Sequence, residues 1–234
     1  MEILFDKLVC AGFERTKERI RDHIIVHCVA GAGKSTLIRE IVTEFPHIEA
    51  YTLGVPDLIN LSGSRIKGIS EYSEGKEQNR AIILDEYLER SVPFKCIGYF
   101  ADPNQYEAKP ERAHFICSTS LRFGSNTAEL ISSLGFPCKS VKQDIIKFES
   151  IFRHNFESED VIVTFEPEIE KLLTDHKVEF KSYCEIRGST FDSVCFITLG
   201  ERFTEKDKYK AYICLTRHRK SLTILTPDAS YTPC

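Results

Sequence analysis

Continuous apolar runs alternate with amphipathic stretches along the first half of the chain. The run at 23–30 leads into a glycine turn, and the apolar residues after that turn recur at helical spacing until Pro46. Further apolar runs lie at 50–54, 80–87 and 94–102. Apolar runs separated by helices are typical of a parallel sheet that is covered on both faces. The pattern therefore predicts an α/β fold.

The same alternation starts again after about residue 115. An apolar run at 114–120 precedes an expected helix at 125–134, and charged connecting segments lead to further expected strands at 160–165, 193–199 and 221–226. A helix is expected around 205–215, between the last two of these strands. Two successive α/β sets of this size predict two small lobes with a cleft between them. We expect an N-terminal helix and linker at 1–22, a first lobe at 23–115 and a second lobe at 116–234.

Composition narrows the classes of function. The net charge of −4 gives no general attraction to polyanions, so any nucleic-acid site must be a local groove. No apolar stretch approaches the ~18 residues that span a bilayer, and the N-terminus lacks a signal-peptide pattern. The nine cysteines are scattered without zinc-ligand spacing, which favours a reducing, intracellular setting. The polar stretch at 55–79 is long for a connector, so we expect it to be mobile or functional.

The segment "GAGKST" has the composition of a phosphate-binding loop. Glycines allow successive backbone N–H groups to surround a phosphate, and the following helix contributes its positive end. We predict that the loop binds a nucleotide through Gly31, Ala32, Gly33, Lys34, Ser35 and Thr36, with the lysine on the β- and γ-phosphates and the Ser35 hydroxyl on Mg²⁺. Cys28 stands where the motif usually begins with glycine. A chance turn at a helix start is the alternative.

Two acids end the apolar run "IILDEY". Asp85 is positioned to bind Mg²⁺ and Glu86 to polarise an attacking water. Two solvated acids at the end of a strand are the alternative interpretation, but the preceding phosphate loop, about 50 residues earlier, favours the metal site.

Three further residues are candidates for catalysis. Gln105, just beyond the next apolar run, is placed to sense the γ-phosphate, although an Asp-Pro-Asn turn alone carries no function. Arg122 and Arg217 lie in the second half and are suited to neutralise the charge that develops during phosphoryl transfer. For Arg217 the alternative is a basic end of a helix. In "RGSTFDSV", Ser189 and Thr190 offer hydroxyl donors for a sugar–phosphate chain.

Taken in order, these segments resemble the motifs of a known family. Seven segments are similar, in the same order, to motifs I, Ia, II, III, IV, V and VI of the superfamily 1 helicases of positive-strand RNA viruses. They are GAGKST, YTLGVPD, LDEY, FADPNQYE, TSLRFG, RGSTFDSV and CLTRHR. The chain further resembles the first triple-gene-block movement proteins of potexviruses and carlaviruses. The resemblance extends over about 23–226. Ala101 stands before Asp-Pro where the family usually has glycine.

The resemblance implies two RecA-like lobes with parallel sheets, ATP or another NTP with Mg²⁺ in the cleft, and single-stranded viral RNA across both lobes. It implies RNA contacts at Thr52, Ser189 and Thr190. It also implies transport of viral RNA through plasmodesmata, suppression of RNA silencing, self-association to a homo-oligomer, and contact with the capsid protein, other movement proteins and host silencing factors. We expect the protein to be located in the host cell cytoplasm, including plasmodesmata, and not to insert into membranes.

Three functions are compatible with these features of the sequence. The first is an RNA-stimulated, Mg²⁺-dependent NTPase with some helicase activity in viral movement. The second is a non-enzymatic RNA-binding scaffold and silencing suppressor, in which the nucleotide site is a switch. A small kinase ranks third, because it needs a lid and an acceptor pocket rather than phosphate-sensing residues at 105, 122 and 217.

Overall fold

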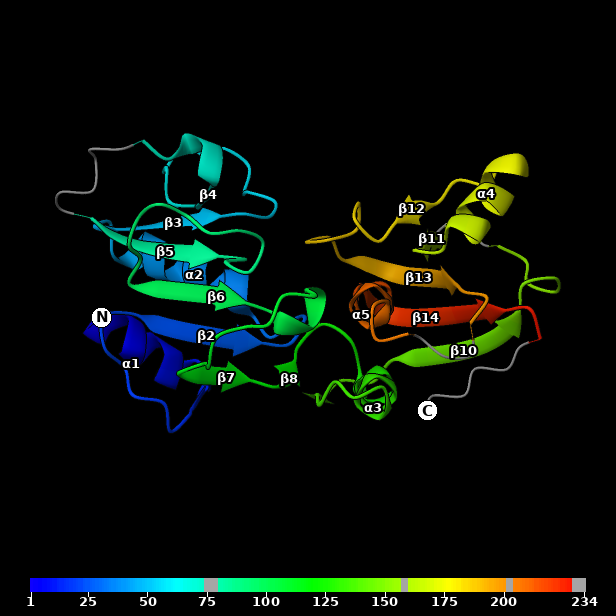
Figure 1. Ribbon diagram of the computed structural model, residues 1–234, viewed down its shortest axis with the longest axis horizontal. Coiled ribbons are helices and arrows are strands. Elements are labelled where there is room, and N and C mark those ends of the chain that lie inside the picture. Colours follow the sequence, from blue (N-terminus) through cyan, green and yellow to red (C-terminus); the bar gives the residue numbers. More distant parts are fainter. Residues whose placement is uncertain (74–79, 157–159, 201–203, 229–234) are drawn as a thin grey trace. The chain divides into compact units, whose positions relative to one another are not determined.

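The structure, a computed structural model, describes residues 1–73, 80–156, 160–200 and 204–228. The chain divides into two compact units, Met1–Ser118 and Thr119–Cys234. Each unit has its own central β-sheet (Figure 1). The α/β fold with two parallel sheets is therefore confirmed. Of the polar stretch predicted at 55–79, residues 74–79 lie outside the described part.

The first unit is built on a seven-stranded sheet of order β1-β7-β2-β6-β5-β3-β4. β1 pairs antiparallel with β7, and the other neighbouring strands are parallel. The bounds are β1 (Glu14–Arg15), β2 (Ile24–Cys28), β3 (Ile48–Thr52), β4 (Ile66–Gly68), β5 (Ala81–Asp85), β6 (Gly98–Ala101) and β7 (Phe115–Cys117), with short 3-10 turns η1 (Ile69–Glu71) and η3 (Pro103–Gln105). Because β2 and β5 both run parallel to β6, the predicted phosphate loop after β2 and the two acids at the end of β5 lie at the same edge of the sheet, where the strands have their carboxyl ends.

The N-terminal segment belongs to this unit and is not a separate region. In α1 (Glu2–Cys10) the side chains of Leu4 and Leu8 are fully buried. Gly98 of β6 accommodates the close approach of α1, since a Cβ there would lie 2.6 Å from Leu4 Cδ2. Arg15 of β1 pairs with Phe115 of β7. The expected separation of residues 1–22 from the first lobe is therefore corrected.

The division between the units also lies later in the chain than expected. The apolar run at 114–120 was predicted to open the second lobe, but β7 pairs with β2 and completes the first sheet. The division falls between Ser118 and Thr119 rather than after residue 115. The sequence could not show this, because an apolar strand has the same residue pattern whichever sheet it pairs with.

One face of the first sheet is covered by loops. Tyr51, Ile82 and Leu84 form a buried cluster there, and the loop residues Tyr72 and Phe94 pack against it. The rings of Tyr72 and Phe94 stack with centroids 4.0 Å apart. Aromatic side chains thus supply the apolar cover that a helix provides elsewhere.

The second unit has a five-stranded, all-parallel sheet of order β10-β14-β13-β11-β12. A separate two-stranded sheet pairs β8 with β9. The bounds are β8 (Thr119–Ser120), β9 (Lys139–Ser140), β10 (Ile145–Ser150), β11 (Val161–Thr164), β12 (Lys181–Ser182), β13 (Phe191–Ile197) and β14 (His218–Thr226). β10 was expected to be a charged connection, because its residues alternate apolar with charged ones and are half-buried or exposed.

The described residues of the second unit also form the helices α3 (Ser125–Ser133), α4 (Pro167–Asp175) and α5 (Lys208–Leu215). Ile169 and Leu173 of α4 pack against Cys195 and Ile197 of β13. The last five residues of α5 are almost completely buried. The predicted helix around 205–215 is thereby confirmed from residue 208 onward, and α5 enters β14 directly through Thr216 and Arg217.

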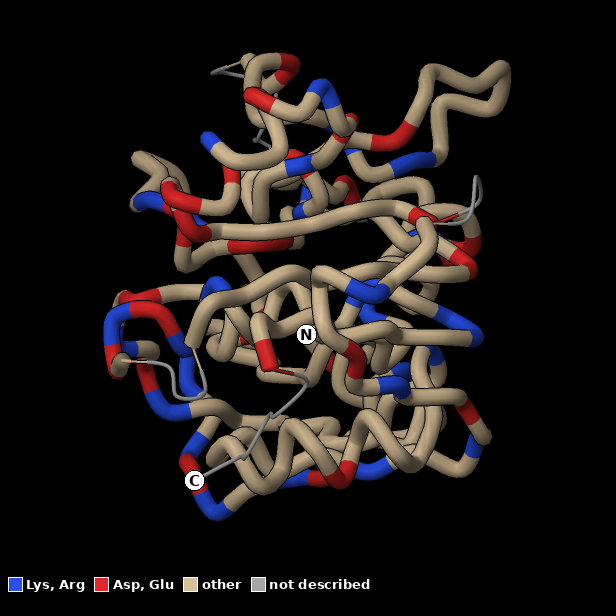
Figure 2. The backbone as a smooth tube through the Cα atoms, turned by 90° about the vertical axis from the view of Figure 1, so that its right-hand side faces the viewer, with Lys and Arg blue, Asp and Glu red and all other residues tan. Residues whose placement is uncertain are grey.

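Charged residues of both signs are interspersed along the chain, and Figure 2 shows no long run of one sign. This distribution agrees with the net charge of −4. In the part of the chain that the structure describes, no helix is long and apolar enough to cross a membrane.

Candidate nucleotide site and arginine cluster

The glycine turn between β2 and α2 (Lys34–Glu44) has the backbone of a phosphate-binding loop. Gly31 and Gly33 have φ angles of 77° and 86°, a region that favours glycine because it has no Cβ. Gly33 is the residue before the first turn of α2, and it has no side chain to cap the helix. The unpaired N–H groups of a helix start are available to an anion, so the loop fits a phosphate.

Cys28 departs from the motif without disturbing this geometry. It is the last residue of β2, and its φ angle is not in the left-handed region that requires glycine. Its thiol is buried and lies 3.8 Å from the backbone oxygen of Ala101 on β6. Burial raises the pKa of the Cys28 thiol well above its usual value, so the side chain acts as an apolar spacer between the two strands.

Lys34 forms the charged centre of the site. Its ammonium group donates to Asp85 and, at 2.5 Å, to Oε1 of Glu86. Burial alone would lower the pKa of Lys34, but the two carboxylates outweigh it and raise that pKa well above its ordinary value. Burial raises the pKa of Asp85 to about 6, with Lys34 opposing this shift. The cation is thus held between the two acids that the sequence assigned to Mg²⁺ and to water.

Glu86 is held in a specific conformation by its surroundings. Its φ angle of 57° is uncommon for a residue with a side chain, which indicates local backbone strain. Tyr106 donates its hydroxyl hydrogen to Oε2 of Glu86 at 2.5 Å. Gly54 passes close by, since a Cβ on it would lie 3.3 Å from Glu86 Cγ. The carboxylate therefore has one oxygen toward Lys34 and the other toward Tyr106.

The predicted metal ligands fit a magnesium ion that takes most of its other ligands from phosphate and water oxygens. Asp85 ends β5 and is buried, while Ser35 is half-buried and Thr36 exposed in the first turn of α2. Among the described residues no group of three or more His, Cys, Asp or Glu side chains forms a metal cage. A site with one carboxylate and one hydroxyl is the kind that Mg²⁺ takes beside nucleotide phosphates.

Gln105 lies at the same edge of the sheet, just after β6. It is buried, and its side-chain amide donates to Asp102 Oδ2 at 2.7 Å. Asp102 also accepts the backbone N–H of Asn104 at 3.1 Å and so caps the short η3 turn. The amide of Gln105 is therefore fixed by a buried carboxylate.

In the second unit the two predicted arginines converge on one threonine. Arg122 donates to the backbone oxygen of Thr216 at 3.1 Å, and Arg217 donates to the hydroxyl oxygen of Thr216 at 3.3 Å. Arg217 also donates from Nε to the oxygen of Ile213 at 3.1 Å, and only 1% of its surface is exposed. The two guanidinium groups come from segments that are 95 positions apart in the sequence yet share this anchor.

The predicted RNA contacts differ in accessibility. Thr52 is buried, and its hydroxyl accepts the backbone N–H of Gly54 at 2.9 Å, so that hydroxyl serves the turn after β3. Ser189 and Thr190 are half-buried in the turn before β13. Gly188 gives that turn its left-handed residue, with a φ of 79°. The part of Thr52, Ser189 and Thr190 in RNA binding stays a prediction.

Two residues that support the site were not singled out from the sequence. They are Tyr106 and Asp102, which hold Glu86 and Gln105. A separate pair in the same unit joins His27 to Tyr87, whose Nε2 and hydroxyl lie 2.8 Å apart. Burial lowers the pKa of His27 to about 4, so its ring is uncharged at neutral pH. The sequence signal for these residues was the tyrosine next to each candidate acid or amide, in the segments "DEY" and "NQYE".

Known proteins share this arrangement of sequence and fold. A family model described as the viral superfamily 1 RNA helicase core domain matches residues 24–226. The chain belongs to the viral superfamily 1 RNA helicases. Within that family, the movement and silencing protein TGBp1 of Poplar mosaic virus (isolate ATCC Pv275) is 41% identical over 234 residues, which is 100% of both chains. The TGBp1 of Apple stem pitting virus (isolate PA66) is 40% identical over 228 residues, covering 97% of this chain and 100% of that protein. The resemblance inferred from the motif order is confirmed.

A solved structure agrees with the helicase fold. The arterivirus nonstructural protein 10 helicase aligns with 97% of this chain at a TM-score of 0.50 and 17% identity. The chain described here spans 56% of the length of that helicase. At this identity the likeness shows the shared fold alone, and the activity of the larger helicase is not carried over.

Proposed function

We propose that this chain is a Mg²⁺-dependent NTPase, stimulated by RNA and with weak helicase activity, that supports cell-to-cell movement of viral RNA and suppresses RNA silencing in the host. The observation that carries the enzymatic part is the buried Lys34 ammonium, held between Asp85 and Glu86 beside a glycine turn. The movement and silencing roles rest on the names of relatives that are 40–41% identical over nearly the whole chain.

The residues of the first unit divide the work of hydrolysis. Lys34 shifts from the carboxylates to the β- and γ-phosphate oxygens, and the loop N–H groups hold the remaining phosphate oxygens. Mg²⁺, when bound, neutralises charge on those oxygens. Glu86, oriented by Tyr106, accepts a hydrogen bond from the attacking water and aligns it with the γ-phosphorus. Gln105, fixed by Asp102, is the candidate sensor of the γ-phosphate.

The arginines of the second unit are proposed to stabilise the charge that builds up on the phosphoryl oxygens. Guanidinium groups suit this role because they stay charged and bind oxygen pairs in a planar fork. Their shared anchor on Thr216 supports the proposal that they act together. RNA is proposed to bind near Ser189 and Thr190 through contacts with its backbone.

One experiment separates the enzyme from its rivals. Purified protein is incubated with γ-labelled NTP and Mg²⁺, with and without single-stranded RNA, and labelled phosphate and labelled acceptors are measured. Release of phosphate that rises with RNA supports the NTPase, binding without turnover supports the scaffold in which nucleotide is a switch, and label on an acceptor supports a kinase. The scaffold is kept as the second candidate because the chain spans 56% of a full viral helicase, so strand separation does not follow from the fold.

The cellular part of the proposal is tested separately. We propose that the protein acts in the host cytoplasm and at plasmodesmata, and that it associates with itself, with capsid protein, with other movement proteins and with host silencing factors. A virus that carries Lys34→Ala is expected to lose movement between cells. A separate silencing-reporter assay then shows whether suppression also needs the nucleotide site.

A further inference from the structure

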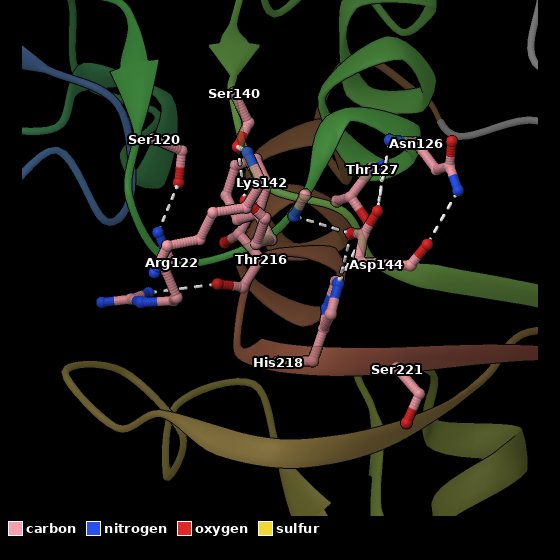
Figure 3. A network of polar contacts seen from close by, with 12 residues as sticks. Ser120, Arg122, Asn126, Thr127, Ser140, Lys142, Asp144, Thr216, His218 and Ser221 are labelled. Atoms are coloured by element: carbon pink, nitrogen blue, oxygen red, sulfur yellow. Dashed lines mark hydrogen bonds and ion pairs between the residues drawn. The ribbon is translucent and has the colours of Figure 1, made fainter.

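One buried carboxylate in the second unit joins segments that are far apart in the sequence (Figure 3). The side chain of Asp144, which immediately precedes β10, has no exposed surface. It accepts the backbone N–H of Gly124 at 2.9 Å and that of Asn126 at 3.2 Å. Gly124 stands at the start of α3 and has no side chain to cap it. Asp144 therefore satisfies the first turn of α3 from another part of the chain.

The same carboxylate contacts a buried histidine. Nε2 of His218 lies 3.1 Å from Oδ2 of Asp144 and 3.0 Å from the hydroxyl oxygen of Thr127 on α3. Nδ1 of His218 is buried without a hydrogen-bond partner in the described part of the chain. An ionised carboxylate only accepts hydrogen bonds, so the ring proton belongs on Nε2. Burial alone would raise the pKa of Asp144, but contacts with His218, Thr127 and Gly124 lower it to about 2.

These contacts lie next to both candidate arginines. His218 follows Arg217 directly, and Gly124 comes two positions after Arg122. Each arginine-bearing segment is thus tied to Asp144 on one side and to Thr216 on the other. Between Arg122 and Gly124, the backbone oxygen of Phe123 accepts a hydrogen bond from the hydroxyl of Ser140 at 2.7 Å.

The packing around this junction leaves no space for adjustment. A Cβ on Gly124 would lie 2.4 Å from the backbone nitrogen of Asp144. His218 and Thr127 have no exposed surface. A buried carboxylate is a weak source of stability compared with a well-packed apolar side chain, but its directional bonds can fix one arrangement of the groups around it.

We propose that Asp144, with Thr127 and His218, is a positioning residue for nucleotide hydrolysis. It fixes the backbone on which Arg122 and Arg217 are carried, so that both guanidinium groups are oriented before phosphate charge develops. Groups that are oriented in advance need no reorganisation during the reaction. This inference rests on the proposed NTPase function and adds Asp144, Thr127 and His218 to it.

The test compares Asp144→Asn with a matched control. Asparagine keeps the shape, but its NH₂ group meets the N–H donors of Gly124, Asn126 or His218. We expect turnover by folded protein to fall ~10-fold or more, with nucleotide affinity changed less than about twofold. Glu166→Gln is the control, because Glu166 also accepts bonds from a distant segment, from Thr198 at 2.5 Å and Leu199 at 2.8 Å. It should leave turnover of the folded protein near normal. Equal turnover in both variants would overturn the proposal.

A double-mutant cycle tests whether Asp144 acts through the arginines. The rate of hydrolysis is measured under single-turnover conditions with excess protein in an Arg122→Ala/Arg217→Ala background. In that background Asp144→Asn should lower the rate by less than about twofold. A repeated ~10-fold loss in that background would show that Asp144 acts by another route, such as general loss of structure, and would overturn the assignment.

A readout without turnover separates this inference from the proposed function. If the wild-type protein hydrolyses no NTP with or without RNA, the NTPase proposal fails, and hydrogen exchange at Arg217 Nε–H still tests the positioning. That group donates to Ile213. In Asp144→Asn we expect its exchange to speed up ~10-fold or more, as for any locally loosened contact. Unchanged exchange in a folded variant would refute positioning.

Discussion

The hydroxyl of Tyr106 donates a hydrogen bond to Glu86 Oε2 across 2.5 Å. Glu86 stands in an uncommon backbone conformation, and its other oxygen contacts Lys34. The tyrosine therefore holds the second oxygen of Glu86 independently of the contact between the first oxygen and Lys34.

Tyr106→Phe is expected to lower turnover about 10-fold and leave nucleotide affinity nearly unchanged, because only the orientation of Glu86 is lost. Steady-state hydrolysis and fluorescent-nucleotide binding measure the two effects. Tyr87→Phe is the matched control, since Tyr87 contacts His27 instead of Glu86. Similar turnover of the two variants would show that the Tyr106 contact does not matter for hydrolysis.

Lys34→Ala is expected to abolish turnover and weaken nucleotide binding, because the β- and γ-phosphates lose their cation. It also leaves Asp85 and Glu86 side by side without a counter-charge, so the nucleotide-free protein should lose about 3–5 kcal/mol of unfolding free energy. Hydrolysis and urea unfolding measure the two losses. Lys7→Ala removes an exposed contact with Glu44 and should change neither property appreciably. Wild-type hydrolysis in Lys34→Ala would rule out the phosphate-loop assignment.

Binding of Mg²⁺–nucleotide should weaken as the pH falls through about 6. Burial raises the pKa of Asp85 to about 6, and the protonated acid cannot bind the metal. The effect on folding has the opposite sign, because the folded state holds this proton more tightly than the unfolded one. The contribution of Asp85 to stability is therefore present below pH ~4 and lost as the pH rises through about 6.

Nucleotide affinity measured at saturating and at low Mg²⁺ from pH 5 to 8 checks this expectation. Asp85→Asn should remove the part of the pH dependence that belongs to the protein, while titration of the nucleotide phosphates stays in both proteins. The same pH dependence in both would assign all of it to the nucleotide.

Arg217→Ala is expected to lower turnover ~10³-fold with a smaller change in nucleotide affinity, since its charge acts mainly on the transition state. Arg217→Lys should rescue poorly, because an ammonium group cannot reproduce the planar fork. The side chain is buried, so both variants must be assayed on the folded fraction. Normal turnover by that fraction would make Arg217 a structural residue and favour the scaffold.

Gly98→Ala should destabilise the first unit by about 1–3 kcal/mol, because the new methyl group must displace Leu4 of α1. Gly68→Ala is the control, since a Cβ there meets neighbours only at 3.5 Å or beyond. Urea unfolding followed by tyrosine fluorescence compares the two. Equal stability would mean that α1 is not part of the cooperative unit.

The local parts of the fold and site could be predicted from the sequence. β2, the glycine turn and α2 follow from neighbouring residues. The motifs also indicated that Lys34, Asp85 and Glu86 belong to one site, and their side chains are in contact, while their roles stay a prediction. What failed depended on pairing between distant segments. β7 was placed with the wrong lobe because its partner β2 lies about 90 residues earlier, and β10 was missed because an edge strand with charged residues has no strong apolar signal.

The supporting residues were missed for a related reason. Tyr106 reaches Glu86 across 20 positions and Asp144 reaches His218 across 74. No spacing rule covers such separations, and an isolated tyrosine or aspartate has many ordinary roles. Thr52 shows another contact that the motif did not indicate, since its buried hydroxyl oxygen accepts the backbone N–H of Gly54.

In the proposed NTPase, Asp85 and Glu86 compete with phosphate for the Lys34 ammonium group, because both carboxylates already contact it. Phosphate must take the ammonium from two carboxylates that are already in place, so part of each nucleotide's binding energy is spent on that exchange. When phosphate leaves, the carboxylates recapture the lysine at once, because they are attached to the same protein. Such an internal rival weakens the hold on product as well as on substrate. The proposed NTPase would thereby release spent nucleotide more readily at the end of each cycle.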